Sequence, residues 1–307
     1  MKLVNFEVDA DVHVGMIVND EIVDLTLALD VQPADIAEFL GIGEETRALA
    51  QRSARHAPQR INVDSAKIRS PILRAGKILG VGMNFRSCVE AADRLGMTFG
   101  PHRLWFYRPG TCIAGPFDDL WLPRGADDLD YEVELVIVIG RHCRYVTVAD
   151  APLVIAGFTV GNDLTLRSRV TKSPVLGKSF DTHLPLGPCI VTPEQVDPHA
   201  LAMKTWVNGI LRQESTTAEM IADCYELIAD ISRSCTLIPG DIILTGTPAG
   251  SGIFHRPALA LLEGDVVKME IAGIGVIENR IIAEPAVPAL RDPSRWRRGD
   301  EGQSAAR

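Results

Sequence analysis

Short apolar runs separated by Gly, Pro and Asn turns dominate the chain from Lys77 onward. KILGVG, VELVIVIG, VIAGFTVGND, DIILTG and DVVKMEIAGIG have the length and the β-branched content of strands. From Thr216 to Ser234 the apolar residues instead recur at helical spacing, and Ser215 or Thr216 with Glu219 resembles a capping box at the helix start. Many strands and few helices predict a β-rich α+β domain rather than a repeat of βαβ units.

The two ends of the chain differ from this central part. HVGMIVNDEIVDL predicts a hairpin that turns at its Asn-Asp pair, and residues 33–55 have apolar positions at helical spacing. The tail from Pro285 contains many Arg and Pro and few apolar residues, which is typical of disorder. We therefore predict a small N-terminal accessory domain over residues 1–70, a main domain over 71–284 and a disordered tail over 285–307.

Composition restricts the classes of binding partner and the cellular compartment that we expect for this protein. The 307 residues carry a formal net charge of −9, which argues against a nucleic acid or an anionic membrane as partner. No apolar run is long enough to span a bilayer, and the first residues lack the pattern of a signal peptide. The six cysteines form no C-x-x-C pair, which favours reduced thiols. These features predict a cytoplasmic protein that acts on a small molecule.

Acidic side chains stand at the ends of two apolar runs. In LDYEVELVIVIG, Glu132 and Glu134 are two residues apart, so in a strand they share one face, about 6.7 Å apart. Asp163 ends VIAGFTVGND. A polar strand edge explains the first pair equally well, and a turn explains Asn-Asp. Three carboxylates at strand ends would suit Mg²⁺ or Mn²⁺ better than zinc.

Two loops are polar in unusual places. LGKSFDTHLPLGP holds Lys178 between glycines and an aromatic residue, and LTGTPAGSG follows a strand. The small residues of the second loop leave backbone N–H groups available for an anion. Ordinary turn chemistry explains both loops as well.

These motifs, together with VNGILRQ and LLEGDVVKMEIAGIGVIENRI, occur in an order that resembles the fumarylacetoacetate hydrolase family over roughly residues 77–282. The resemblance implies a mixed β-sheet roll as the catalytic domain, usually in a homodimer. It implies Mg²⁺, or Mn²⁺ or Ca²⁺, held by Glu132, Glu134 and Asp163. It also implies that Lys178 contacts the reacting oxygens, and that the substrate is bound by Arg167, Thr247, Gly246 and Phe85.

Family substrates are small oxo acids, and the resemblance implies hydrolysis of a C–C bond in an acylpyruvate or a fumarylacetoacetate-like acid in aromatic catabolism. The family's hydrolases activate water with a His-Glu pair in N-Y-x-x-H-x-x-E. Here NFRSCVEA has Cys88 and Ala91 at those places, and Glu90, one position away, is the base that we predict. Decarboxylation or isomerisation of a 2-oxo acid needs no activated water and stays an alternative. A non-catalytic metabolite-binding protein is a further one.

The same stretch predicts a lid. Gly82, Gly96 and Gly100 punctuate residues 83–100, which we expect to be mobile without ligand. Two more positions depart from the family pattern, because Val170 replaces a polar residue and Arg108 replaces a Lys in F-x-K-P.

Overall fold

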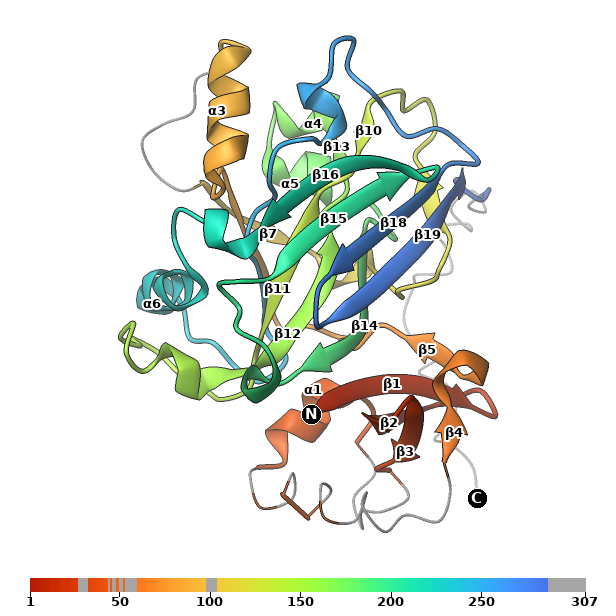
Figure 1. Ribbon diagram of the computed structural model, residues 1–307, viewed down its shortest axis with the longest axis vertical. Helices are drawn as coiled ribbons and strands as arrows, with labels where there is room; N and C mark the ends of the chain where they lie inside the picture. Colours follow the sequence, from red (N-terminus) through yellow and green to blue (C-terminus); the bar gives the residue numbers. More distant parts are fainter. Residues whose placement is uncertain are drawn as a thin grey trace, which may run out of the picture.

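The computed structural model describes residues 1–26, 33–43, 60–97 and 104–286, together with positions 45, 48, 49 and 52. Two β-sheets form the body of the molecule, and short helices lie around them (Figure 1). No helix in these residues is long and apolar enough to cross a membrane. Nearly all of the predicted tail lies outside the described residues, as do residues 44, 46, 47, 50, 51 and 53–55 of the predicted helix over 33–55 and residues 98–100 of the predicted lid.

The larger sheet joins the N-terminal part of the chain to the main domain through the pairing of β1 with β14. Its strand order is β4 (Ile61–Asn62), β3 (Glu21–Asp24), β2 (Asp11–Val18), β1 (Lys2–Val8), β14 (Leu184–Val191), β12 (Ile155–Asn162), β11 (Val133–Ile139), β17 (Ile242–Leu244), β6 (Ile78–Gly82) and β7 (Leu104–Arg108). Beside this path, β5 (Lys67–Arg69) pairs with β1 and β8 (Ile113–Ala114) pairs with β14. The predicted hairpin is confirmed, since Val18 of β2 pairs with Glu21 of β3 across Asn19-Asp20.

The smaller sheet has the order β16 (Ile210–Thr216), β15 (Ala202–Val207), β18 (Val266–Ile271), β19 (Gly275–Ala283) and β9 (Leu120–Leu122). A short ribbon pairs β10 (Leu129–Asp130) with β13 (Thr165–Leu166). Met203, Met269 and Ile277 of the smaller sheet share one buried core with Leu135 and Val160 of the larger. The site described below lies at one end of this core.

The α-helices of the described residues with defined bounds are α1 (Ile36–Gly41), α3 (Arg86–Arg94), α4 (Arg167–Val170), α5 (Pro174–Lys178) and α6 (Cys224–Ser234). The helix that we predicted to begin at Thr216 begins eight residues later. Residues 210–216 pair with β15 along their whole length, which keeps this backbone extended. Thr216 caps only a single 3₁₀ turn, and the capping box of α6 is formed by Asp223 and Glu226.

The central strands explain where the acidic residues emerge. Every residue of β11 and of β12 is buried, so these strands have apolar side chains on both faces. The start of β11 lies beside the end of β12, because Val133 pairs with Asn162. Polar residues at these two strand ends therefore meet at one edge of the core.

Candidate metal centre

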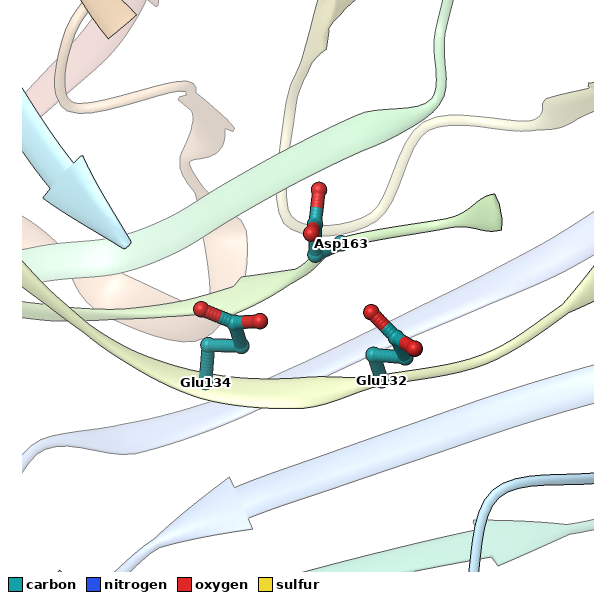
Figure 2. A group of neighbouring side chains, drawn as sticks. All are labelled: Glu132, Glu134 and Asp163. Atoms are coloured by element: carbon teal, nitrogen blue, oxygen red, sulfur yellow. The ribbon is translucent and has the colours of Figure 1, made fainter. Parts of the chain in front are cut away.

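Glu132, Glu134 and Asp163 come together at this edge. The two glutamates project from the same side of β11, and Asp163 follows β12 next to them (Figure 2). One carboxylate oxygen of each lies within 4.8 Å of the others, and all three side chains are buried. The predicted clustering of these residues at strand ends is confirmed.

Cationic side chains surround the three carboxylates. Lys178, the last residue of α5, places its Nζ 2.7 Å from Glu132 Oε2 and also hydrogen-bonds Asp163. Arg167, the first residue of α4, donates to Glu132 Oε1 over 2.6 Å. Arg108, fully buried, forms an ion pair with Asp163. These contacts fix the carboxylates of Glu132 and Asp163, whereas none of them reaches Glu134.

A fourth carboxylate belongs to the cluster. Asp130 of β10 accepts hydrogen bonds from Arg167 Nε over 2.8 Å and from the backbone N–H groups of Gly252 and Ile253 over 2.6 and 3.0 Å. Four acidic groups thus face three basic ones, which leaves one negative charge uncompensated by the described residues. The four are Asp130, Glu132, Glu134 and Asp163, and the three are Arg108, Arg167 and Lys178.

The charge is least compensated at Glu134. Burial and the neighbouring charge of Asp163 raise the pKa of the Glu134 carboxyl well above its ordinary value, and this carboxyl accepts a hydrogen bond from the N–H of Gly246, 2.7 Å away. At Glu132 burial acts in the same direction, but Lys178 and Arg167 outweigh it and lower the pKa to about 2. An all-oxygen donor set with excess negative charge fits a hard divalent cation such as Mg²⁺, Mn²⁺ or Ca²⁺.

Glu132, Glu134 and Asp163 line part of a cavity of about 410 Å³. Apolar side chains form another part of the lining, and they include Met83, Met97, Leu104, Phe106 and Phe254. Of the residues that we predicted to bind substrate or metal, the cavity is lined by Glu132, Glu134, Asp163, Arg167, Lys178, Gly246 and Thr247. Two predicted residues are absent from this lining: Phe85 is fully buried in the core, and Glu90 is exposed on the outside of α3.

Cys88 of α3 lines the cavity. Cys88 and Glu90 are two residues apart, which places them about 200° apart around the helix axis. The Cys88 thiol lies 4.0 Å from Met83 Sδ. Burial, reinforced by the charge of Glu132, raises its pKa to about 12, so it stays protonated at neutral pH. The structure therefore does not bring the predicted base, Glu90, to the carboxylates.

The loop after β17 does bind anions, but they belong to the protein itself. Gly246 donates its N–H to Glu134, and Gly252 and Ile253 donate theirs to Asp130. Our interpretation that these small residues leave their N–H groups available is therefore wrong at Gly246 and Gly252. The loop positions carboxylates of the site.

Sequence reasoning missed Asp130 and Gln213. Asp130 continues the alternation of Glu132 and Glu134 back along the chain, and this period of two is the signal by which it could be found. Gln213 stands in VNGILRQ with no local sign of its role, because three of its four partners lie 34 to 80 residues away. Arg108 was noticed only as a replacement, whereas the structure makes it the partner of Asp163.

Fold and site together define a protein of the fumarylacetoacetate hydrolase family, to which this chain belongs. The family model of the fumarylacetoacetate (FAA) hydrolase C-terminal region matches residues 77–282. The chain is 37% identical over 291 residues to the mitochondrial oxaloacetate tautomerase FAHD2B of Bos taurus, covering 92% of each chain. It is 36% identical over 273 residues to the human mitochondrial oxaloacetate tautomerase FAHD2A, covering 87% of this chain and 84% of that one.

Solved structures of the same fold include family enzymes with different activities. The fumarylacetoacetate hydrolase of Exiguobacterium antarcticum matches with a TM-score of 0.80 and 32% identity, covering 92% of this chain and all of that one. The maleylpyruvate hydrolase of Sphingobium sp. SYK-6, in complex with manganese(II) and pyruvate, matches with a TM-score of 0.77 and 29% identity, covering 93% of this chain and all of that one. The expected β-rich family fold is confirmed.

Proposed function

We propose that this protein is a divalent-metal-dependent tautomerase that interconverts the keto and enol forms of a small 2-oxo dicarboxylic acid such as oxaloacetate. One observation carries the proposal: the residue of α3 that lines the cavity is Cys88, a thiol that stays protonated at neutral pH. The helix that carries the His-Glu pair in the family's hydrolases thus supplies no base for water here. A keto–enol exchange moves protons and needs no attacking water.

The proposal is also supported by the relatives, since the bovine and human proteins are named oxaloacetate tautomerases. Their similarity extends over most of both chains and therefore includes the N-terminal part.

Glu132, Glu134 and Asp163 would hold the cation, for which we propose Mg²⁺, with Mn²⁺ or Ca²⁺ as alternatives. When bound, it supplies the Lewis acidity that polarises the 2-oxo group. The donor set fits, because the three ligands are carboxylates and one of them, Glu134, forms no ion pair with a described residue.

Lys178 is the group that stabilises the enolate oxygen. Burial disfavours its charge, but Asp163 and Glu132 outweigh burial and raise the pKa of the ammonium group, so it stays charged. Its three N–H groups bond Glu132, Asp163 and Thr165, and one of them would turn to the enolate oxygen when the substrate binds. The ring of Phe106 lies 5.0 Å from Lys178 Nζ and forms part of the apolar wall that limits the access of water to this donor. Arg167 and Thr247 line the cavity and would bind the carboxylates of the acid.

C–C hydrolysis of an acylpyruvate or fumarylacetoacetate-like acid, in the catabolism of aromatic compounds, is the second candidate. It is favoured by the similarity to a maleylpyruvate hydrolase and by the apolar wall of a 410 Å³ cavity, which would accept a longer acid than oxaloacetate. Glu90 would serve as base only if α3 turned. Decarboxylation of oxaloacetate and a non-catalytic metabolite-binding role are the remaining alternatives.

One set of assays with purified protein separates these functions. Enol oxaloacetate and acetylpyruvate are each supplied with Mg²⁺ or with chelator. Loss of the enol absorbance without pyruvate formation supports tautomerisation, pyruvate with carbon dioxide supports decarboxylation, and acetylpyruvate cleavage supports hydrolysis. No turnover of either acid under any condition contradicts the proposal.

A homodimer in the cytoplasm is the assembly that we propose, on the basis of the family resemblance. Exposed apolar side chains on neighbouring elements, Leu104 and Tyr107 of β7 with Val175 and Leu176 of α5, support a protein–protein contact there. Light scattering after size-exclusion chromatography would give a mass near 33.4 kDa for a monomer and contradict this assembly.

A further inference from the structure

Gln213 is a buried amide that lies between the strand carrying the two glutamates and the loop after β17. It belongs to β16, in the smaller sheet, whose strands β15 and β16 lie over β11 (Figure 1). The side chain is 1% exposed, so its polar atoms must be satisfied within the protein.

All four hydrogen-bonding positions of this amide are used. Its Oε1 accepts the N–H of Val133 over 3.2 Å and the hydroxyl of Thr205 over 2.9 Å. Its Nε2 donates to Thr247 Oγ1 over 2.9 Å and to the carbonyl oxygen of Pro248 over 3.0 Å. A glutamine side chain has two lone pairs and two N–H donors, and none remains.

The chemistry of these partners fixes the orientation of the amide. The N–H of Val133 can only donate, and the carbonyl of Pro248 can only accept. A flipped amide would place N–H against N–H at Val133 and oxygen against oxygen at Pro248. Gln213 must therefore present a donor to Thr247.

The orientation of Gln213 in turn determines what Thr247 can do. Because Thr247 Oγ1 accepts a hydrogen bond from Gln213, its own hydroxyl proton is available to another acceptor. Among the described residues no acceptor of that proton is found, while Thr247 lines the cavity and is 8% exposed. The hydroxyl therefore offers a donor to the cavity.

We infer that Gln213 is a positioning residue that fixes Thr247 as a hydrogen-bond donor toward the substrate. The group bound at Thr247 is then an acceptor, a carboxylate or oxo oxygen, and a hydroxyl or ammonium group that must donate is excluded from this place. The inference deepens the proposed function and rests on it for the class of substrate. Gln213 also links the loop after β17 to the metal ligands, because it accepts the N–H of Val133, the residue between Glu132 and Glu134.

The test is a double-mutant cycle between Gln213 and Thr247. Gln213→Glu keeps the acceptor for Val133 and Thr205 but loses both donors, so the hydroxyl of Thr247 turns away from the cavity to donate to it. Thr247→Val removes the hydroxyl at constant shape. Oxalate, which is not turned over, serves as the probe, and its affinity is measured by calorimetry in saturating Mg²⁺.

Each single variant should weaken oxalate binding by about tenfold, the scale of one hydrogen bond to a charged group. The double variant should bind no more weakly than either single one, because both changes remove the same donor. Thr247→Ser, which retains the hydroxyl, should bind oxalate within about twofold of the unchanged protein, whereas Mg²⁺ affinity should stay the same in all variants.

Thr205→Val is the matched control, because it removes a hydrogen bond at the other end of Gln213. It should lower Tm without changing oxalate affinity. If Gln213→Glu does not fold, Gln213→Met replaces it in the same cycle. The inference is overturned if a Gln213 variant binds oxalate normally, or if its full effect persists in the Thr247→Val background. If the variants lose oxalate binding non-additively but the unchanged protein does not turn over oxaloacetate, the inference stands and the proposed function is contradicted.

Discussion

Lys178 Nζ lies 2.7 Å from Glu132 Oε2, although 46 positions separate the two residues in the chain. The contact joins the end of a five-residue helix to the residue that precedes β11. Because both side chains are buried, neither can be changed without leaving the other charge less compensated.

Lys178→Met should lower kcat by about a hundredfold or more, since one well-aimed donor to a developing anion contributes roughly 3 kcal/mol. Mg²⁺ should bind at least as tightly, because the three carboxylates remain and two of them lose a competing cation. Steady-state rates of enol oxaloacetate decay measure the effect. Lys204→Met removes an exposed lysine that pairs with Glu214 and should retain the full rate. A rate near that of the unchanged protein would exclude Lys178 from the chemistry.

Glu134→Gln and Asp163→Ala should both abolish metal-dependent activity but differ in stability. In chelator, Glu134→Gln should leave the free energy of unfolding unchanged or raised, because it removes a buried charge that burial and Asp163 disfavour. Asp163→Ala should cost about 3–5 kcal/mol, since it leaves Arg108 buried without its partner. Urea unfolding measures both values, and equal losses would contradict this charge arrangement.

His183 should make the protein less stable in mild acid. Burial lowers the pKa of its imidazole from 6.5 to about 4, so the folded state holds it neutral. The unfolded chain binds this proton first as pH falls below 6.5, and the stabilisation present above that pH is lost progressively down to about pH 4. The loss from this residue is about 3 kcal/mol. In His183→Asn the free energy of unfolding should fall less steeply over this window.

The residues of α3 discriminate tautomerisation from hydrolysis. If the proposed function holds, Glu90→Gln should alter the rate by less than about twofold, like the control Asp93→Asn on the same helix, because an exposed carboxylate off the cavity is no general base. Hydrolysis with Glu90 as base predicts a loss of about a hundredfold or more instead.

The converse change adds a base. Cys88→His with Ala91→Glu should introduce acetylpyruvate hydrolysis, since both residues are buried on the inner side of α3. Efficient acetylpyruvate hydrolysis by the unchanged protein, insensitive to Glu90 and Cys88, would mean that water is activated by other groups.

Much of the site was predictable because its signals are local. Glu132 and Glu134 share a face because side chains alternate along a strand, and Asp163 ends an apolar run, so a few neighbouring residues suffice to predict these three positions. Asp130 bonds Gly252 across 122 positions, and Gln213 bonds Val133 across 80. Contacts at such separations depend on how strands and loops from distant parts of the chain pack together, which no short motif encodes.

The start of α6 was mispredicted for a related reason. Thr216 and Glu219 offer a plausible local cap, but residues 210–216 form backbone hydrogen bonds with β15 that a helix would sacrifice. The orientation of α3 was also beyond the sequence, since it decides which of Cys88 and Glu90 faces inward. Tertiary pairing overrides local preference at both places.

The pairing of β1 with β14 has a consequence for aggregation. Lys2 and Leu3 of β1 pair with Val191 and Ile190 of β14, so the first strand of the chain occupies this edge of β14 in the larger sheet. A chain cut before Lys77 would leave the backbone donors and acceptors of that border open, flanked by the apolar side chains of LPLGPCIV. Such an uncovered border is a template for a strand of another molecule. The N-terminal part would thus prevent edge-to-edge aggregation of the larger sheet, independently of any role in catalysis.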